Sequence, residues 1–170
     1  LVEDRALGLE QGMGFFDYGI VDQHFLRRGR YGRLVAALEV TARRFGFGVA
    51  DNRALRVDRN THVGEALGDR AVCVIDSAEV RREGLSRLGL RFSLLGGGAR
   101  VDLKSGRVTP AAGKREGGRR LRPTFDAAEE LMPFGRETLA RLADRAAQVP
   151  GQPQRAEGVH FVAVVSAGER

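Results

Sequence analysis

Apolar positions early in the chain predict a buried strand followed by a helix. The run GIVDQHF at 19–25 has the apolar start expected of a buried strand. Residues 27–45 then predict a loop that turns into a helix, because apolar positions recur with the i, i+3, i+4, i+7 spacing of one helix face. The residues of this face are Leu34, Ala37, Leu38 and Thr41.

The middle of the chain carries a series of short β signals. Glycine, aspartate and asparagine separate them, as expected of strands joined by tight turns. Several runs alternate apolar with polar residues, which predicts antiparallel strands with one solvated face. The expected strands cover residues 46–50, 54–58, 71–76, 90–95 and 99–103.

The pattern changes after about residue 108. Residues 109–123 form a polar segment rich in glycine and arginine without periodicity, which predicts a linker. A helical patch follows at 124–148, with Thr124 suited to cap it and Pro133 interrupting it. A second linker at 149–158 and a strand at 159–165 complete the chain. We therefore expect three parts: a domain at 1–108, a linker at 109–123 and an appendage at 124–170.

Charge narrows the set of partners only slightly. The 170 residues include 28 Lys+Arg and 22 Asp+Glu, a formal charge of +6, and Lys104 and Lys114 are the only lysines. The arginine excess has two explanations, a GC-rich coding sequence or a surface that binds anions. Among proteins with an anion-binding surface, a nucleic-acid binder is less favoured, because the chain has no helix-turn-helix, zinc or aromatic-platform pattern.

The single cysteine and the hydropathy exclude several classes of protein. Cys73 lies in the apolar run AVCVID, where we expect a buried thiol, and one cysteine forms neither an internal disulfide nor an all-cysteine metal site. The three histidines lack metal-ligand spacing, so we expect no metal and no organic cofactor. The sequence contains no run of 18 apolar residues, so we predict no membrane span. A cytoplasmic location is favoured, with secretion the alternative if the N-terminus was processed.

The segment 21–34, VDQHFLRRGRYGRL, carries the most specialised chemistry. His24 follows a predicted strand, and strand ends in α/β folds point into ligand-binding crevices. A histidine there can act as a general base if a carboxylate orients its ring and a nucleophile is near. The alternative is a histidine that only stabilises the turn between strand and helix.

Arginines cluster just after this histidine. Arg28, Arg30 and Arg33 repel one another unless Asp22, a second carboxylate or an acidic ligand offsets their charge. Such a cluster is costly for a turn of purely structural function. We therefore interpret it as a carboxylate-binding pocket beside a base.

These residues resemble the signature of the cyanophycinases, serine-type exopeptidases with a fold similar to the class I glutamine amidotransferases. The family pattern D-Q-H-F-x-x-R-x-R-x-x-R-L is matched at every fixed position of 22–34. The segments 10–21, 46–57 and 90–103 are more weakly similar to other parts of the family. The resemblance covers roughly residues 9–104, and it implies the C-terminal half of a flavodoxin-like three-layer α/β domain with additional short antiparallel strands.

The resemblance also implies a substrate and residue roles. The substrate class is β-linked aspartyl-arginine peptide, and His24 is the catalytic base. Asp51 matches the acid that orients the histidine, although the family commonly has the longer glutamate at this position. The remaining matching residues imply a substrate pocket formed by Asp22, Gln23, Arg28, Arg30 and Arg33.

The serine nucleophile of the family has no counterpart before His24. The family's serine lies on a strand-to-helix elbow upstream of the histidine, and residues 1–21 contain no serine. Ser166, in the sequence S-A-G after an apolar run, resembles the elbow locally, but a solvated strand end is the preferred interpretation.

Three hypotheses account for this absence. In the first, which the start at Leu1 favours, the chain is a subunit or processed part of a hydrolase whose serine lies on a companion chain. In the second, an upstream segment carrying the serine is missing. In the third, the chain is a non-catalytic protein that binds acidic or β-aspartyl peptides.

Overall fold

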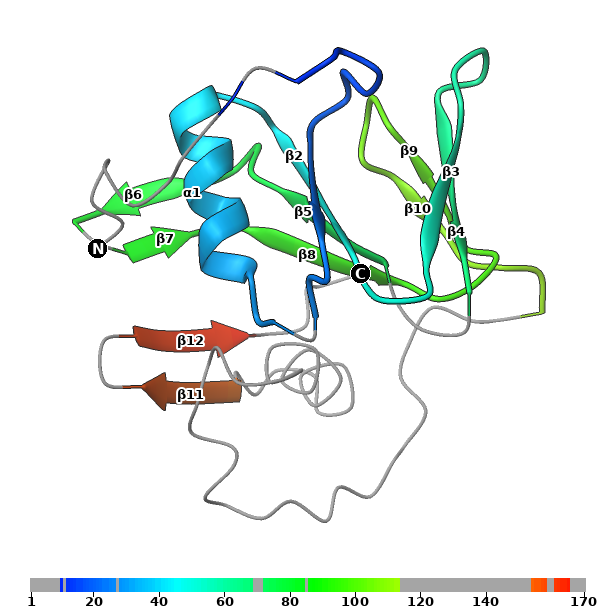
Figure 1. Ribbon diagram of the computed structural model, residues 1–170. Coiled ribbons are helices and arrows are strands. Elements are labelled where there is room, and N and C mark those ends of the chain that lie inside the picture. Colours follow the sequence, from blue (N-terminus) through cyan, green and yellow to red (C-terminus); the bar gives the residue numbers. More distant parts are fainter. Residues whose placement is uncertain are drawn as a thin grey trace. The chain divides into compact units, whose positions relative to one another are not determined.

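A computed structural model describes residues 10, 12–26, 28–68, 72–84, 86–113, 154–158 and 161–165 (Figure 1). Tertiary contacts divide the chain into two units, Leu1–Phe25 with Arg30–Lys114 and Leu26–Gly29 with Arg115–Arg170. The described residues form a mixed α/β structure, which confirms the predicted α/β class. Among them there is no helix with the length and apolar character needed to cross a membrane.

The first sheet has the strand order β1-β2-β5-β8. Strand β1 runs parallel to β2, and helix α1 connects the two, whereas β2, β5 and β8 are antiparallel neighbours. All four strands were predicted from the sequence, with bounds that differ by one or two residues. The elements are β1 (Ile20–Gln23), α1 (Tyr31–Thr41), β2 (Phe45–Val49), β5 (Val72–Asp76) and β8 (Arg91–Leu95).

The second sheet is antiparallel throughout, with the order β10-β9-β4-β3. The sequence predicted β3 and β9 but missed β4, in which Gly64 and Glu65 interrupt the apolar pattern, and β10, which has only two residues. A separate hairpin of β6 and β7 was also missed, because β6 is fully exposed and contains only charged residues. The elements are β3 (Ala54–Asp58), β4 (Val63–Leu67), β9 (Arg100–Asp102), β10 (Val108–Thr109), β6 (Arg81–Glu83) and β7 (Ser86–Leu88).

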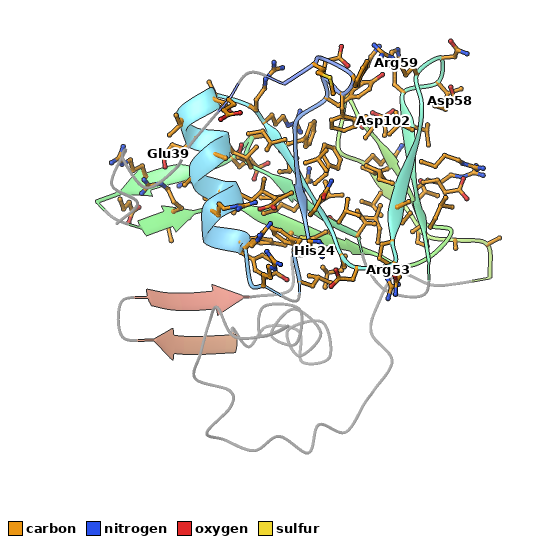
Figure 2. All side chains as sticks on the ribbon, viewed as in Figure 1. His24, Glu39, Arg53, Asp58, Arg59 and Asp102 are labelled. Carbon is orange, nitrogen blue, oxygen red and sulfur yellow. The ribbon has the colours of Figure 1, made fainter. Side chains whose placement is uncertain are left out.

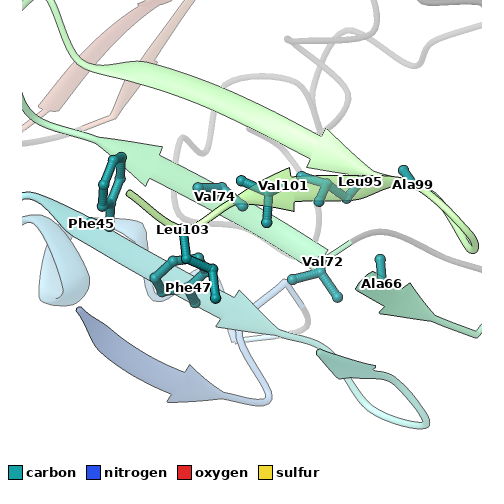
Figure 3. Packing of buried hydrophobic residues seen from close by; sticks show 9 residues of the cluster. All are labelled: Phe45, Phe47, Ala66, Val72, Val74, Leu95, Ala99, Val101 and Leu103. Carbon is teal, nitrogen blue, oxygen red and sulfur yellow. The ribbon is translucent and has the colours of Figure 1, made fainter. Parts of the chain in front are cut away.

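Strand β2 separates two packed layers, because alternate residues of a strand face opposite sides of a sheet. Phe45 and Phe47 face the second sheet, where they join the main hydrophobic core (Figure 3). Gly46 and Gly48 face the helix side, where a Cβ on Gly46 would lie 2.9 Å from the Leu34 side chain. The helix, the first sheet and the second sheet therefore form three successive layers within this unit. The nine core residues are Phe45, Phe47, Ala66, Val72, Val74, Leu95, Ala99, Val101 and Leu103.

Strand β5 lies at the centre of the first sheet and is buried along its whole length. The solvated face expected of strands that alternate apolar with polar residues is confirmed for β3, whose residues alternate in exposure. Strands β2 and β5 are apolar runs without such alternation, and nearly all of their residues are buried. Cys73 is fully buried in β5, as predicted, and this burial raises the pKa of its thiol to about 12.

The described part of the second unit is one antiparallel hairpin of β11 (Gln154–Gly158) and β12 (Phe161–Val165). Strand β12 confirms the strand predicted at 159–165. Residues 154–158 were expected to be linker, and this was wrong, because pairing with β12 holds a polar segment extended. The helical patch predicted at 124–148 lies outside the described residues, and the boundaries at 108 and 123 remain predictions.

Candidate catalytic histidine site

His24 lies directly after β1, at the carboxyl end of the strand (Figure 2). Its backbone is left-handed, with φ of 52°. Few residues other than glycine adopt this conformation, although histidine, asparagine and aspartate do so more often than most. The next residue returns to the sheet, because the Phe25 N–H donates to the carbonyl of Val49 at 3.3 Å. The tight turn therefore takes His24 out of the strand, at the end of the sheet where β1 finishes.

Asp51 is brought to the same edge by β2. The last residues of the two parallel strands, Gln23 and Val49, are paired in register, so the chain leaves both strands side by side. A left-handed Asn52, with φ of 57°, turns the chain directly after Asp51. The Nδ1 of His24 donates to Oδ1 of Asp51. Neighbouring strands are only about 4.8 Å apart, and this explains why the short aspartate side chain reaches the ring.

The contact between His24 and Asp51 determines which ring nitrogen is available for chemistry. Because Nδ1 donates to the carboxylate, Nε2 is the nitrogen that carries the lone pair. The histidine side chain is 51% exposed and the aspartate 32% exposed, so a substrate can reach the pair. A histidine oriented in this way can take a proton through Nε2 while the carboxylate stabilises the resulting cation.

Asp22 is a buried carboxylate that two arginines neutralise. Its side chain is 4% exposed and accepts from Arg33 through Nε at 3.0 Å and Nη2 at 2.5 Å. Arg30 Nη1 adds a third bond at 3.0 Å and also donates to the carbonyl of Gln23 at 2.9 Å. The sequence left three groups that could offset the positive charge of the arginines: Asp22, a second carboxylate or an acidic ligand. For Arg30 and Arg33 that group is Asp22. These ion pairs also fix the turn that carries His24, because Arg33 belongs to the first turn of α1.

The other residues of the predicted pocket are exposed. Gln23 ends β1 with its side chain at the surface. Arg28 is exposed within the turn Leu26–Gly29, which groups with the second unit. Substrate-binding roles for these five polar residues remain predictions.

Sequence reasoning missed two residues that support the histidine. Phe25 is completely buried and its ring packs on Gly48, where a Cβ would lie 2.2 Å from Cδ1 of the ring. The ring also contacts Tyr31 of α1, with centroids 4.5 Å apart and planes at 60°. The alternation of glycine and phenylalanine along β2 was the available signal, since it places small residues under the helix.

The described side chains do not place a serine beside the histidine. Ser77 Oγ donates to the carbonyl of Arg44 at 2.9 Å, near the start of β2, and Ser105 Oγ donates to Asp102 at 2.9 Å. Ser93 lies in the middle of β8, two strands away from β2. Ser166 lies outside the described residues. Within the described part of the chain, no three His, Cys, Asp or Glu side chains are grouped so that they could hold a metal ion.

A histidine–carboxylate pair at adjoining strand ends of an α/β sheet is an arrangement that hydrolases use to activate a nucleophile. No protein-family model matches the chain. Cyanophycinases from Trichormus variabilis and from a Nostoc species are each 30% identical to it over 109 residues, which cover 59% of this chain and 36% of the relative.

A third cyanophycinase, from Geminocystis herdmanii, is 29% identical over 112 residues, covering 60% of this chain and 41% of the relative. The chain is therefore cyanophycinase-like over somewhat more than half of its length, as a partial match. It spans only about two fifths, or less, of the length of these curated relatives.

Proposed function

We propose that this chain supplies the catalytic histidine of a cyanophycinase-like serine peptidase that hydrolyses β-aspartyl-arginine type peptides. The observation that carries the proposal is the hydrogen bond from His24 to Asp51 at the carboxyl ends of two adjoining parallel strands. The similarity to cyanophycinases supports the same reaction class.

In the proposed mechanism, His24 is general base and then general acid. Its Nε2 takes the proton of a serine hydroxyl as the oxygen attacks the substrate carbonyl, and Asp51 holds the ring and stabilises the cation. The proton then passes to the leaving amine, and a water molecule that gives its proton to Nε2 releases the acyl group as an acid and restores the serine. The contact between His24 and Asp51 supports the roles proposed for the pair. Arg28 and the half-exposed Arg33 are proposed to attract the carboxylate of the substrate.

The nucleophilic serine is proposed to lie on a preceding segment or a companion chain. Strand β1 is at the end of the described first sheet, and it runs parallel to β2. A further parallel strand paired to β1 would end next to His24, because parallel strands share their carboxyl edge. A serine elbow after that strand would complete the site. This arrangement is the one expected of a class I glutamine amidotransferase-like domain, of which we propose that this chain forms the C-terminal half.

The test is hydrolysis of a β-aspartyl-arginine dipeptide by the natively purified protein, together with its native and denatured masses. His24→Asn removes the base while keeping a residue that tolerates a left-handed backbone. We expect at least a hundredfold loss of kcat/KM. His62→Asn is the matched control, since His62 also has positive φ, 56°, but belongs to the β3–β4 turn. Equal activity of both variants would contradict the proposal.

A second candidate function is favoured by the lack of a described serine side chain near His24. In this alternative the chain binds acidic or β-aspartyl peptides without cleaving them. Peptide affinity that survives His24→Asn but falls in Arg28→Gln, in a protein without hydrolytic activity, would select the binding function.

A further inference from the structure

A pocket lies at the opposite end of the first sheet from His24. It has a volume of about 410 Å³ and is bounded by the last turns of α1, the residues before β2, and the β5–β6 connection. Glu39, on its rim, and His24 are labelled at different ends of the helix in Figure 2. Because the five residues of β2 separate the two sites, they are about 17 Å apart.

The floor of this pocket is apolar. Its apolar lining consists of Val35 and Leu38 of α1 together with Val80 and Leu90, and Val80 remains 40% exposed. Apolar side chains that line a concave site favour ligands with an apolar body. A volume of this size is in the range of small-molecule sites.

The rim carries four arginines and one glutamate, a formal charge of +3. Glu39 accepts from Arg87 Nη2 at 2.8 Å and lies 3.5 Å from Arg82 Nη1, so two guanidiniums share one carboxylate.

The positive charge of Arg44 is offset by a buried carboxylate. Its guanidinium donates to Asp76 through Nε at 2.8 Å and Nη2 at 3.0 Å, and Asp76 also accepts from Arg91. Arg43, in contrast, donates to the carbonyl of Asp17 at 3.3 Å, a neutral acceptor. Even when Arg91, Asp76 and the neighbouring Glu79 are included, the formal charge around the pocket is +2.

We propose that this pocket binds a carboxylate carried on an apolar body. The carboxylate would bridge Arg43 and Arg82, where the positive charge is least offset, and the apolar body would lie against Val80 and Leu90. Such a ligand has two sources, a free aliphatic carboxylic acid or the C-terminus of a peptide that ends in an apolar residue. The site is independent of the proposed peptidase function, because it shares no residue with the histidine site.

Two probes distinguish the sources when titrated into the full chain at low salt and followed by NMR. Octanoate represents a free aliphatic acid, and N-acetyl-leucine represents a peptide C-terminus. We expect saturable binding of at least one probe, and binding at least tenfold weaker for acetate and for N-acetyl-leucinamide, which each lack one half of the recognised chemistry. No saturable binding of either probe, or equal binding of acetate, would overturn the proposal.

Substitutions locate the binding. Arg43→Gln should weaken the better probe about fivefold, because a charge-assisted contact is lost at a partly solvated site. Arg100→Gln is the matched control, since Arg100 is a 62% exposed arginine on β9, outside the pocket. Val80→Asn tests the apolar floor and should also weaken binding, while thermal unfolding verifies that each variant is folded. Equal affinity in Arg43→Gln and Arg100→Gln would overturn the proposal.

Discussion

The ring of Phe25 lies on Gly48 so closely that a Cβ at Gly48 would be 2.2 Å from the ring. Phe25 follows His24 in sequence, and Gly48 pairs with Asp22 in the parallel register. This contact therefore links the helix-side packing of the first sheet to the turn that presents His24. Glycine is required here because any side chain would occupy the space of the ring.

Gly48→Ala should destabilise the protein by about 1–3 kcal/mol, because the added methyl group overpacks a buried site and forces Phe25 away from the sheet. Urea unfolding monitored by circular dichroism measures this change. Gly96→Ala is the matched control, since a Cβ there meets no atom within 4 Å. Equal midpoints for the two variants would show that the Phe25–Gly48 contact is not tight.

Asp51 should hold the His24 proton on Nδ1 at pH values where the ring is neutral, because that nitrogen donates to the carboxylate. Nitrogen-15 NMR of the ring reports the tautomer. In Asp51→Ala we expect the signature of a proton held on Nδ1 to be lost, whereas Asp17→Ala, at an exposed carboxylate, should leave it unchanged. A His24 tautomer identical in both variants would contradict the orienting role of Asp51.

Asp22→Asn should reduce the free energy of unfolding by roughly 2 kcal/mol at pH 7, since it leaves Arg30 and Arg33 without their shared carboxylate. The value is below that of a fully buried pair because the Arg33 side chain is half exposed. Asp17→Asn, the control at an exposed position 3.9 Å from Arg59, should change stability by less than about 0.5 kcal/mol. Denaturant titration of both variants is the measurement, and similar losses in both would exclude a special role for the buried pair.

Asp76 should make stability fall in acid. Burial by itself raises the pKa of this carboxyl, but hydrogen bonds from Arg44, the Ala78 N–H and Arg91 outweigh it and lower the pKa to about 2, from 3.8. Because the folded pKa is depressed, the ionised carboxylate stabilises the protein above about pH 4, and this contribution is lost as the pH falls towards 2. Its size is about 2 kcal/mol.

The measurement is the free energy of unfolding between pH 5 and about pH 2, compared with that of Asp76→Asn. The difference between the two proteins should shrink as the pH falls, since only the wild type loses the charge of Asp76. Asp58 and Asp102 also have lowered pKa values, through hydrogen bonds from the backbone N–H groups of Asn60 and Ser105, but they are present in both proteins. A difference independent of pH would contradict the prediction.

Local pattern was sufficient for most of the first sheet and for α1. The helix appeared as a 3.6-residue repeat at Leu34, Ala37 and Leu38, all of which are buried. Strands β2, β3 and β5 appeared as apolar or alternating runs. Five strands were missed: β4, β6, β7, β10 and β11. Of these, β4, β6 and β11 are rich in polar residues or glycine, and each is held by pairing with a neighbouring strand, which a local sequence pattern does not reveal.

The site shows the same division. The sequence by itself singled out His24 and the arginines after it, because these residues lie together in one short segment. The resemblance to cyanophycinases pointed to Asp51. Tertiary structure decided that Gln23 and Val49 end β1 and β2 side by side, so that His24 and Asp51, 27 positions apart, are in contact. It also decided that Asp22 serves Arg30 and Arg33, and that the far end of α1 forms a basic pocket. These outcomes depend on strand register and layer packing, which bring together groups that are distant in the chain. A run of neighbouring residues does not reveal such contacts.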